Sequence, residues 1–134
     1  MITCYAFTIE LPQALPGAVQ ALRAALAAEQ MGIVSEVDVQ PWLQAGPGPA
    51  LHPQRLLGIC SPKMAHALLS AEPELGALLP CGCGVAEATP GCTRIALQDP
   101  RTITAVTDNA DVRAACELAH AALRRVVDRL ASPA

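Results

Sequence analysis

The sequence predicts an α+β fold: a two-layer sandwich with the element order β-α-β-β-α-β-β-α, a mainly antiparallel sheet and helices on one face. Residues 33–39 alternate apolar and polar side chains, which is typical of a half-buried strand. Residues 112–130 repeat apolar side chains at helical spacing. Two short apolar runs, 85–88 and 93–97, flank Thr89-Pro90-Gly91 and indicate a hairpin. Hairpin strands combined with amphipathic helices favour a sheet that is covered on one side.

The first half of the chain is predicted to hold a strand, a helix and a second strand. Residues 2–9 alternate weakly and predict the first strand. Pro16 suits the first turn of the following helix, and Gly32 suits the position just after a helix end, so the helix should end near residue 31. After the strand over 33–39, Pro41-Trp42-Leu43 indicates a turn or a short helical piece.

The second half begins with residues 55–60, a short apolar run that predicts a strand buried on both faces. Ser61-Pro62 then predicts a helix start, with serine as N-cap and proline at the first helical position. This helix must end by residue 72, because Pro73 disfavours helical geometry in the residue before it. After the hairpin, Asp108 or Asn109 caps the final helix.

Composition indicates one folded domain over residues 1–134, with a proline- and glycine-rich loop at 46–53. The chain has 134 residues, of which 52% are hydrophobic and 16% charged, and this balance excludes a disordered chain. The net charge of −3 argues against nucleic acid as a partner. No apolar run is long enough for a membrane span. The amino-terminal residues lack the basic segment of a signal peptide, so we expect a cytoplasmic protein with reduced cysteines.

Three of the six cysteines predict a binding site. Cys81 and Cys83 are two residues apart, so in an extended segment both thiols point to the same face. Cys60 ends the strand before the Ser61 helix start, and it could supply a third thiolate to copper or zinc. Ser61 and His66 complete the set of candidate ligand-binding residues, and His66 could supply a fourth ligand to the metal.

Structural explanations of these residues, without a binding role, also remain open. Free cysteine is among the most buried residue types, so these thiols could simply pack in the core. Cys116 and His120 are one helical turn apart, but their positions on the apolar stripe favour packing. Asp99-Pro100-Arg101 predicts a turn with a local salt bridge. The sequence contains no known catalytic motif.

Several segments resemble the domain of unknown function 302 family. These are LGICSPKMAHAL at residues 57–68, EPELGALLPC at 72–81 and MGIVSEVDV at 31–39, and the resemblance extends over about residues 18–125. It implies an α+β fold in small, commonly dimeric proteins with no settled activity. The chain departs from the pattern at Ser61, where the family usually has Asn, and at Gly82-Cys83, where it usually has Asn-Val.

Three functions remain open from the sequence. The first is a dimeric binding module whose cysteine site takes a soft metal, a sulfur species or a reversible oxidation. The second is a structural or interaction protein whose cysteines only pack. The third is an enzyme that uses Cys60 as its nucleophile. The homodimer is expected from the alanine-rich, apolar composition and from the resemblance.

Overall fold

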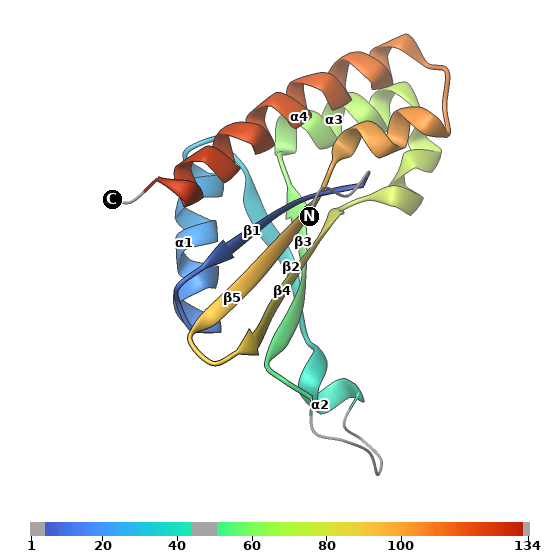
Figure 1. Ribbon diagram of the computed structural model, residues 1–134. Coiled ribbons are helices and arrows are strands. Elements are labelled where there is room, and N and C mark those ends of the chain that lie inside the picture. Colours follow the sequence, from blue (N-terminus) through green and yellow to red (C-terminus); the bar gives the residue numbers. More distant parts are fainter. Residues whose placement is uncertain (1–4, 44–50, 133–134) are drawn as a thin grey trace.

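Five strands form one sheet, and the larger helices lie on one side of it (Figure 1). The computed structural model describes residues 5–43 and 51–132; the predicted strand residues 2–4 and loop residues 46–50 lie outside them. The strands are β1 (Ala6–Leu11), β2 (Gly32–Asp38), β3 (Gln54–Cys60), β4 (Cys81–Thr89) and β5 (Cys92–Gln98). The helices are α1 (Leu15–Ala27), α2 (Val39–Leu43), α3 (Pro62–Ala71) and α4 (Ala110–Ala131), with 3-10 helices η1 (Pro73–Leu78) and η2 (Pro100–Ala105). The predicted α+β architecture is confirmed; α2 corresponds to the short helical piece expected at residues 41–43, and η1 and η2 are short additions.

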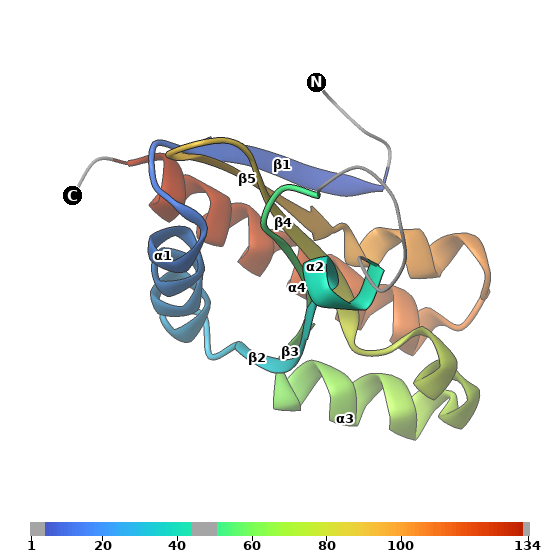
Figure 2. The same ribbon diagram turned by 90° about the horizontal axis from the view of Figure 1, so that it is seen from below.

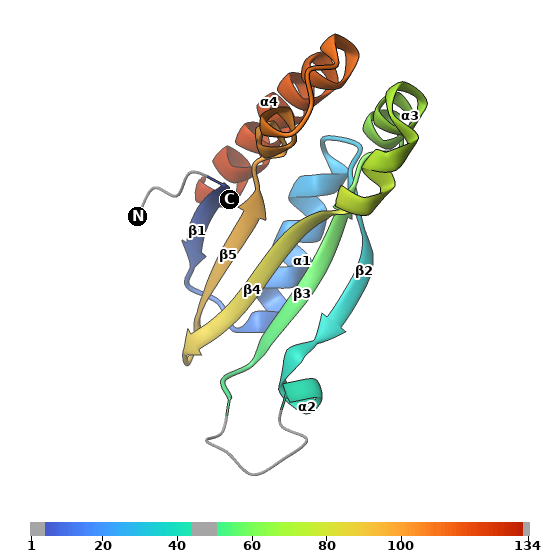
Figure 3. The same ribbon diagram turned by 90° about the vertical axis from the view of Figure 1, so that its right-hand side faces the viewer.

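The sheet has the strand order β1-β5-β4-β3-β2, and every neighbouring pair is antiparallel. β1 and β2 flank α1 in the sequence, yet they form opposite edges of the sheet. Figure 3 shows the five strands in this order with α1 behind them. The hairpin between β4 and β5 turns at Gly91, whose φ of 79° lies in the left-handed region that glycine adopts without strain.

Within the described residues, no helix covers the sheet face opposite α1, α3 and α4, which corrects one prediction. Leu57 and Ile59 of β3 point into the core, but Leu56 between them is 48% exposed. The strand over 55–60 was predicted to be buried on both faces; it is buried on one. The prediction failed because Leu56 is apolar but lies on the exposed face, so the sequence lacks the polar residue that would have marked that face.

The core has two parts that share helix α4. The larger part packs α1 and the carboxyl-terminal half of α4 on the sheet, and its fully buried members include Leu22, Leu26, Ile95, Leu97 and Val126. The smaller part joins α3, η1 and η2 to the amino-terminal half of α4, through Leu68, Leu75, Ile103, Val112 and Cys116. The 22 residues of α4 span about 33 Å, enough to bridge both parts.

Helix ends follow the predicted capping chemistry in α3 and α4. The Ser61 hydroxyl accepts a hydrogen bond from the Met64 amide at 3.4 Å, and α3 ends before Glu72, as predicted. Of the two predicted caps for α4, Asn109 is used, and its side chain accepts from the amides of Asp111 and Val112. In the part of the chain that the structure describes, no helix is both long and apolar enough to cross a bilayer.

Both ends of α1 differ from what local sequence rules suggest. The helix ends at Ala27, not near residue 31, because Gln30 makes the reversal at φ 59° and Gly32 already belongs to β2. At its start Ala14 offers no side-chain cap, and the Leu15 amide donates instead to Glu87 of β4 at 2.7 Å. Glu87 also accepts from the Gly91 amide, so one carboxylate holds the hairpin turn and the start of α1 together.

Candidate ligand-binding groove

Three helical segments enclose a groove of about 370 Å³. One wall is the end of α1 and the turn that follows it, a second is the first turns of α3, and the third is the middle of α4. In Figure 2, α1 and α3 lie near the same end of β2 and β3, with α4 behind them. The volume lies within the range of small-molecule sites in proteins.

Small side chains on α4 create this space. Ala115, Ala119 and Ala122 line the groove and are spaced by four and three residues, so they lie on one side of the helix. Each leaves unfilled the volume that a larger side chain would occupy. Leu118 at the rim, together with Met31 and Met64 from the other walls, makes the rest of the lining largely apolar.

Charged groups gather at the groove. Lys63 and Arg125 line it, and Lys63 is the only lysine in the sequence. Glu29 lies opposite and accepts from Arg125 at 2.8 Å and from Arg129 at 3.2 Å. The hydrogen bond from Arg125 lowers the pKa of Glu29, and Arg129 lowers it further. Together these two interactions outweigh burial, which raises the pKa. Two arginines therefore hold one ionised carboxylate at the groove, and Lys63 adds a further positive charge to its lining.

The structure places Cys81 and Cys83 on the core side of the sheet. Cys81 pairs with Ile59 and Cys83 with Leu57, and all four side chains are buried. The prediction that both thiols share a face is therefore confirmed. Both cysteines are free.

Burial makes these thiols poor nucleophiles. It raises the pKa of Cys83 to about 12. The pKa of Cys81 is raised to about 11, chiefly by burial and to a smaller extent by Cys116 and Cys60 nearby. At neutral pH both groups are therefore protonated, and the thiolate is the reactive form.

The other candidate residues are spread more widely. Cys60 follows Ile59 at the end of β3, so strand alternation directs it to the face opposite Cys81 and Cys83. His66 is exposed on α3. Within residues 5–43 and 51–132, no three His, Cys, Asp or Glu side chains are grouped so as to hold a metal ion. Ser61 is the one predicted ligand-binding residue that lines the groove.

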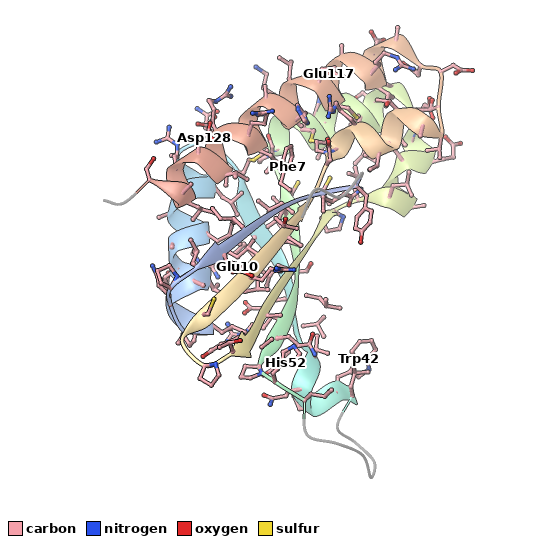
Figure 4. All side chains as sticks on the ribbon, viewed as in Figure 1. Phe7, Glu10, Trp42, His52, Glu117 and Asp128 are labelled. Carbon is pink, nitrogen blue, oxygen red and sulfur yellow. The ribbon has the colours of Figure 1, made fainter. Side chains whose placement is uncertain are left out.

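A second polar cluster lies under α4, at the end of β5. Asp99 Oδ1 lies 3.0 Å from His120 Nδ1, and the His120 ring lies 5.1 Å from that of Phe7 between centroids. Figure 4 shows Phe7 just below α4. Asp99 also accepts from the Arg101 amide and guanidinium group, which confirms the predicted local salt bridge.

Sequence reasoning missed the groove because the groove depends on the absence of large side chains, and no sequence motif marks such an absence. Ala115 and Ala119 lie within the apolar pattern that predicts the last helix over residues 112–130, and their small size does not distinguish a groove from a packed core. Arg125 and Arg129 follow a spacing that is typical of a solvated helix face, yet they bind Glu29, 96 and 100 residues earlier in the chain. The one available signal was the isolated Lys63 in the first turn of a helix.

Comparisons with known proteins agree on one family. The family model described as "Domain of unknown function DUF302" matches residues 7–130, a wider region than the one over which the motifs were recognised. Among solved structures, the chain is similar to the "Crystal structure of uncharacterized conserved protein DUF302 from Bacillus stearothermophilus". That match has a TM-score of 0.83 and 20% sequence identity, and it covers 96% of this chain and 99% of the other, which shows a shared fold. No curated protein matches the chain.

Proposed function

Because the chain belongs to the DUF302 family, whose description assigns no activity, we propose a function from its geometry: it is a binding module that takes a small, partly apolar molecule into the helical groove. The observation that carries this proposal is the groove itself, about 370 Å³ in volume. Its lining combines apolar side chains with a few polar groups, which is the usual make-up of a small-molecule site.

The size of the side chains supports binding as the reason for the groove. A void between helices forfeits dispersion contacts, so a merely structural contact would be better filled by leucine than by alanine. A ligand that covers Met31 and Met64 would restore those contacts. Methionine is flexible enough to adapt to the shape of such a ligand.

The test is an NMR titration of ¹⁵N-labelled protein with amphiphiles of eight carbons: octanoate, octyl phosphate, 1-octanol and octylammonium. Binding of any of them should shift the amide signals of Ala67, Ala119 and Ala122, which line the groove. Ala67→Leu, at an exposed position in the lining, should weaken that binding. Ala114→Leu, the same change at an exposed position of α4 outside the groove, should not. If none of the four compounds shifts these signals, the proposal is wrong.

A cysteine-based site for a soft metal, a sulfur species or reversible oxidation is the second candidate. One observation favours it: Cys60 directly follows Ile59, which pairs with Cys81 across β3 and β4, and Cys60 is only half-buried. Two thiolates can begin a copper or zinc site but do not complete a tetrahedral one. Elemental analysis with thiol counting on protein purified without oxygen tests this candidate. About one metal per chain that protects these two thiols would support it, and metal-free protein with freely titrating thiols would refute it.

We also propose that the protein is a homodimer joined through the uncovered sheet face. A transverse row runs across this face through Val37, Leu56, Gly84 and Ala96, one residue from each of four neighbouring strands. Val37 and Leu56 are 43% and 48% exposed and form a ridge, while Gly84 and Ala96 leave a shallow region beside it. Under a twofold axis, the ridge of each copy fits the shallow region of the other.

Light scattering tests the dimer. The wild-type protein should have twice the chain mass of 13.9 kDa at micromolar concentration. Ala96→Arg places a large charge in the shallow region and should give the monomer mass. Ala114→Arg, the same change on the exposed side of α4, should leave the dimer intact. A wild-type mass of one chain would refute the proposal.

We further propose a cytoplasmic protein with neither nucleic acid nor membrane as partner. The cysteines that the structure describes are all free, which fits a reducing compartment. The net charge of −3 supports the absence of a nucleic-acid partner. Fractionation of the native host cells would test the location.

A further inference from the structure

We infer that the groove selects a small amphipathic anion, whose carboxylate or phosphate group is held by Lys63 while its apolar part lies along the alanines of α4. This inference rests on the proposed function and adds the chemical class of the ligand. It follows from the charges around the groove, from the pairing of those charges and from the position of Lys63 in its helix.

The charge at the groove opposes that of the whole chain. The protein carries a net charge of −3, and lysine and arginine together number only nine. Lys63, Arg125 and the Glu29 carboxylate nevertheless line the groove, and Arg129 pairs with Glu29 from beside it. These four groups together carry a charge of +2, which attracts anions to this face of an otherwise acidic protein.

Pairing within the cluster leaves Lys63 for a ligand. Arg125 Nε and Arg129 donate to the two carboxylate oxygens of Glu29, so this acid is satisfied by the arginines. Lys63 makes no ion pair with any residue in the described part of the chain. Its ammonium group can therefore take an external anion without breaking an existing contact.

The position of Lys63 in α3 adds to its attraction for anions. Lys63 is the second residue of the helix, and the first turn contains no acidic residue. A cation at a helix amino terminus is unfavourable, because the helix dipole already places partial positive charge there. Lysine here costs stability in the free protein, and a bound anion would relieve that cost. Ser61, which also lines the groove at this end, can donate its hydroxyl hydrogen to the same anion.

The walls of the groove determine the rest of the ligand. Behind the cations lie Met31, Met64 and the α4 alanines, none of which offers a side-chain hydrogen bond of ordinary strength. A fully polar ligand such as a free phosphate ion would leave this apolar surface exposed to water. A ligand with an anionic end and a short apolar tail satisfies both ends of the groove.

The same four eight-carbon compounds test the inference, because they share a tail and differ in head group. Octanoate or octyl phosphate should bind at least fivefold more tightly than 1-octanol, and octylammonium should bind most weakly. The stronger of the two anions identifies the source of the anionic group as a carboxylate or a phosphate ester. If 1-octanol or octylammonium binds as tightly as both anions, the groove is a binding site but the anion inference is wrong. If no compound binds, the proposed function fails with it.

Substitutions connect the selectivity to Lys63. Lys63→Gln should weaken binding of the preferred anion about fivefold and leave binding of 1-octanol unchanged. Arg124→Gln removes a positive charge from an exposed position of α4 outside the groove, and it should change neither affinity. Equal losses in the two variants would mean that total charge, not Lys63, attracts the anion, which would overturn the assignment. Because Lys63 is exposed, the Lys63→Gln variant should stay folded, and its amide spectrum should keep the signal dispersion of the wild type.

A direct signal from Lys63 gives a second readout. Reductive methylation with ¹³C-formaldehyde labels lysine side chains, and this sequence contains one lysine. Addition of the preferred anion should shift the dimethyl signal of Lys63, and 1 M salt should reverse much of the shift by screening the charge. A dimethyl signal that stays constant while the groove amides shift would show that the anion binds without Lys63.

Discussion

Asp99 and His120 form a hydrogen-bonded pair that ties the end of β5 to the middle of α4, with 3.0 Å between Oδ1 and Nδ1. Their side chains are 12% and 13% exposed. Asp99 also caps η2 by accepting from the Arg101 amide at 2.9 Å. One carboxylate therefore connects the sheet, the 3-10 helix and the helix that joins the two parts of the core.

Removal of this carboxylate should destabilise the fold. We expect Asp99→Ala to lower the free energy of unfolding by about 2–3 kcal/mol, since it removes charge-assisted hydrogen bonds and a helix cap from a buried position. Asp99→Asn keeps an acceptor for the Arg101 amide and should lose less. Urea denaturation monitored by circular dichroism measures both changes. An alanine variant as stable as the wild type would contradict the structural role of the pair.

The same residue predicts a pH dependence of stability. Partial burial would raise the pKa of Asp99, but hydrogen bonds from the Arg101 amide, His120 and the Arg101 side chain outweigh it, and the pKa lies below its ordinary value of 3.8. The folded state therefore binds this proton less readily than the unfolded state. The stabilisation is fully present above the ordinary pKa and is lost as the pH falls through the lower folded value.

The measurement compares wild type and Asp99→Asn by urea denaturation from pH 5 to pH 2. The difference in unfolding free energy should shrink below about pH 4, as the unfolded carboxyl group becomes protonated. Glu29 and Glu87 also have lowered pKa values, but both proteins contain them, so their effects cancel in the difference. A difference that stays constant over this range would show that Asp99 stabilises the fold only as an uncharged acceptor.

Thiol reactivity should follow burial. Burial raises the pKa of Cys81 to about 11 and that of Cys83 to about 12. The pKa of Cys116 is also raised, chiefly by burial. Among the five cysteines that the structure describes, iodoacetamide at pH 8 should therefore modify the half-buried Cys60 and Cys92 first. Mass spectrometry of the native protein over time, with urea-unfolded protein as the control, locates the modified residues. Modification of Cys83 in the folded protein as fast as Cys60 would contradict the buried placement.

A tight contact at Gly58 predicts a position where only glycine fits. A Cβ atom there would lie 2.5 Å from Cγ of Pro80 and would also meet the Ser35 hydroxyl. Gly58→Ala should therefore cost about 1–3 kcal/mol through overpacking. Gly32→Ala is the control, because a Cβ atom at Gly32 meets nothing within 4 Å. Thermal unfolding of both variants measures the contrast, and equal melting temperatures would show that the neighbours of Gly58 yield freely.

The sequence predicted the elements well because their signals are local. Ser61 capped a helix, Pro73 ended one, and Gly91 marked a turn through rules that act within a few residues. Such rules failed where a distant residue replaces the local signal. The amide of Leu15, the first residue of α1, is capped by the Glu87 carboxylate, which lies 72 residues away in the sequence. No residue near Leu15 predicts this cap.

The candidate site was harder to predict for a related reason. Cysteine attracts functional interpretation because of its chemistry, but reactivity depends on burial, which appears only after the sheet has formed. The groove needs three helices from separate parts of the chain, and its alanines resemble ordinary core residues in sequence. Ser61 belongs to both the predicted and the observed site because one helix start lies at the edge of each.

The edge position of β1 affects how the chain folds during synthesis. β1 pairs only with β5, so Ala6 must wait for Gln98 to leave the ribosome before its strand has a partner. α1 follows β1 directly and is made early, but the sheet on which it packs is completed last. β3, β4 and β5 are adjacent in the sheet in chain order and can assemble first. The residues of β1 are thus synthesised well before the strand that pairs with them, and they stay without that protection until β5 has been made.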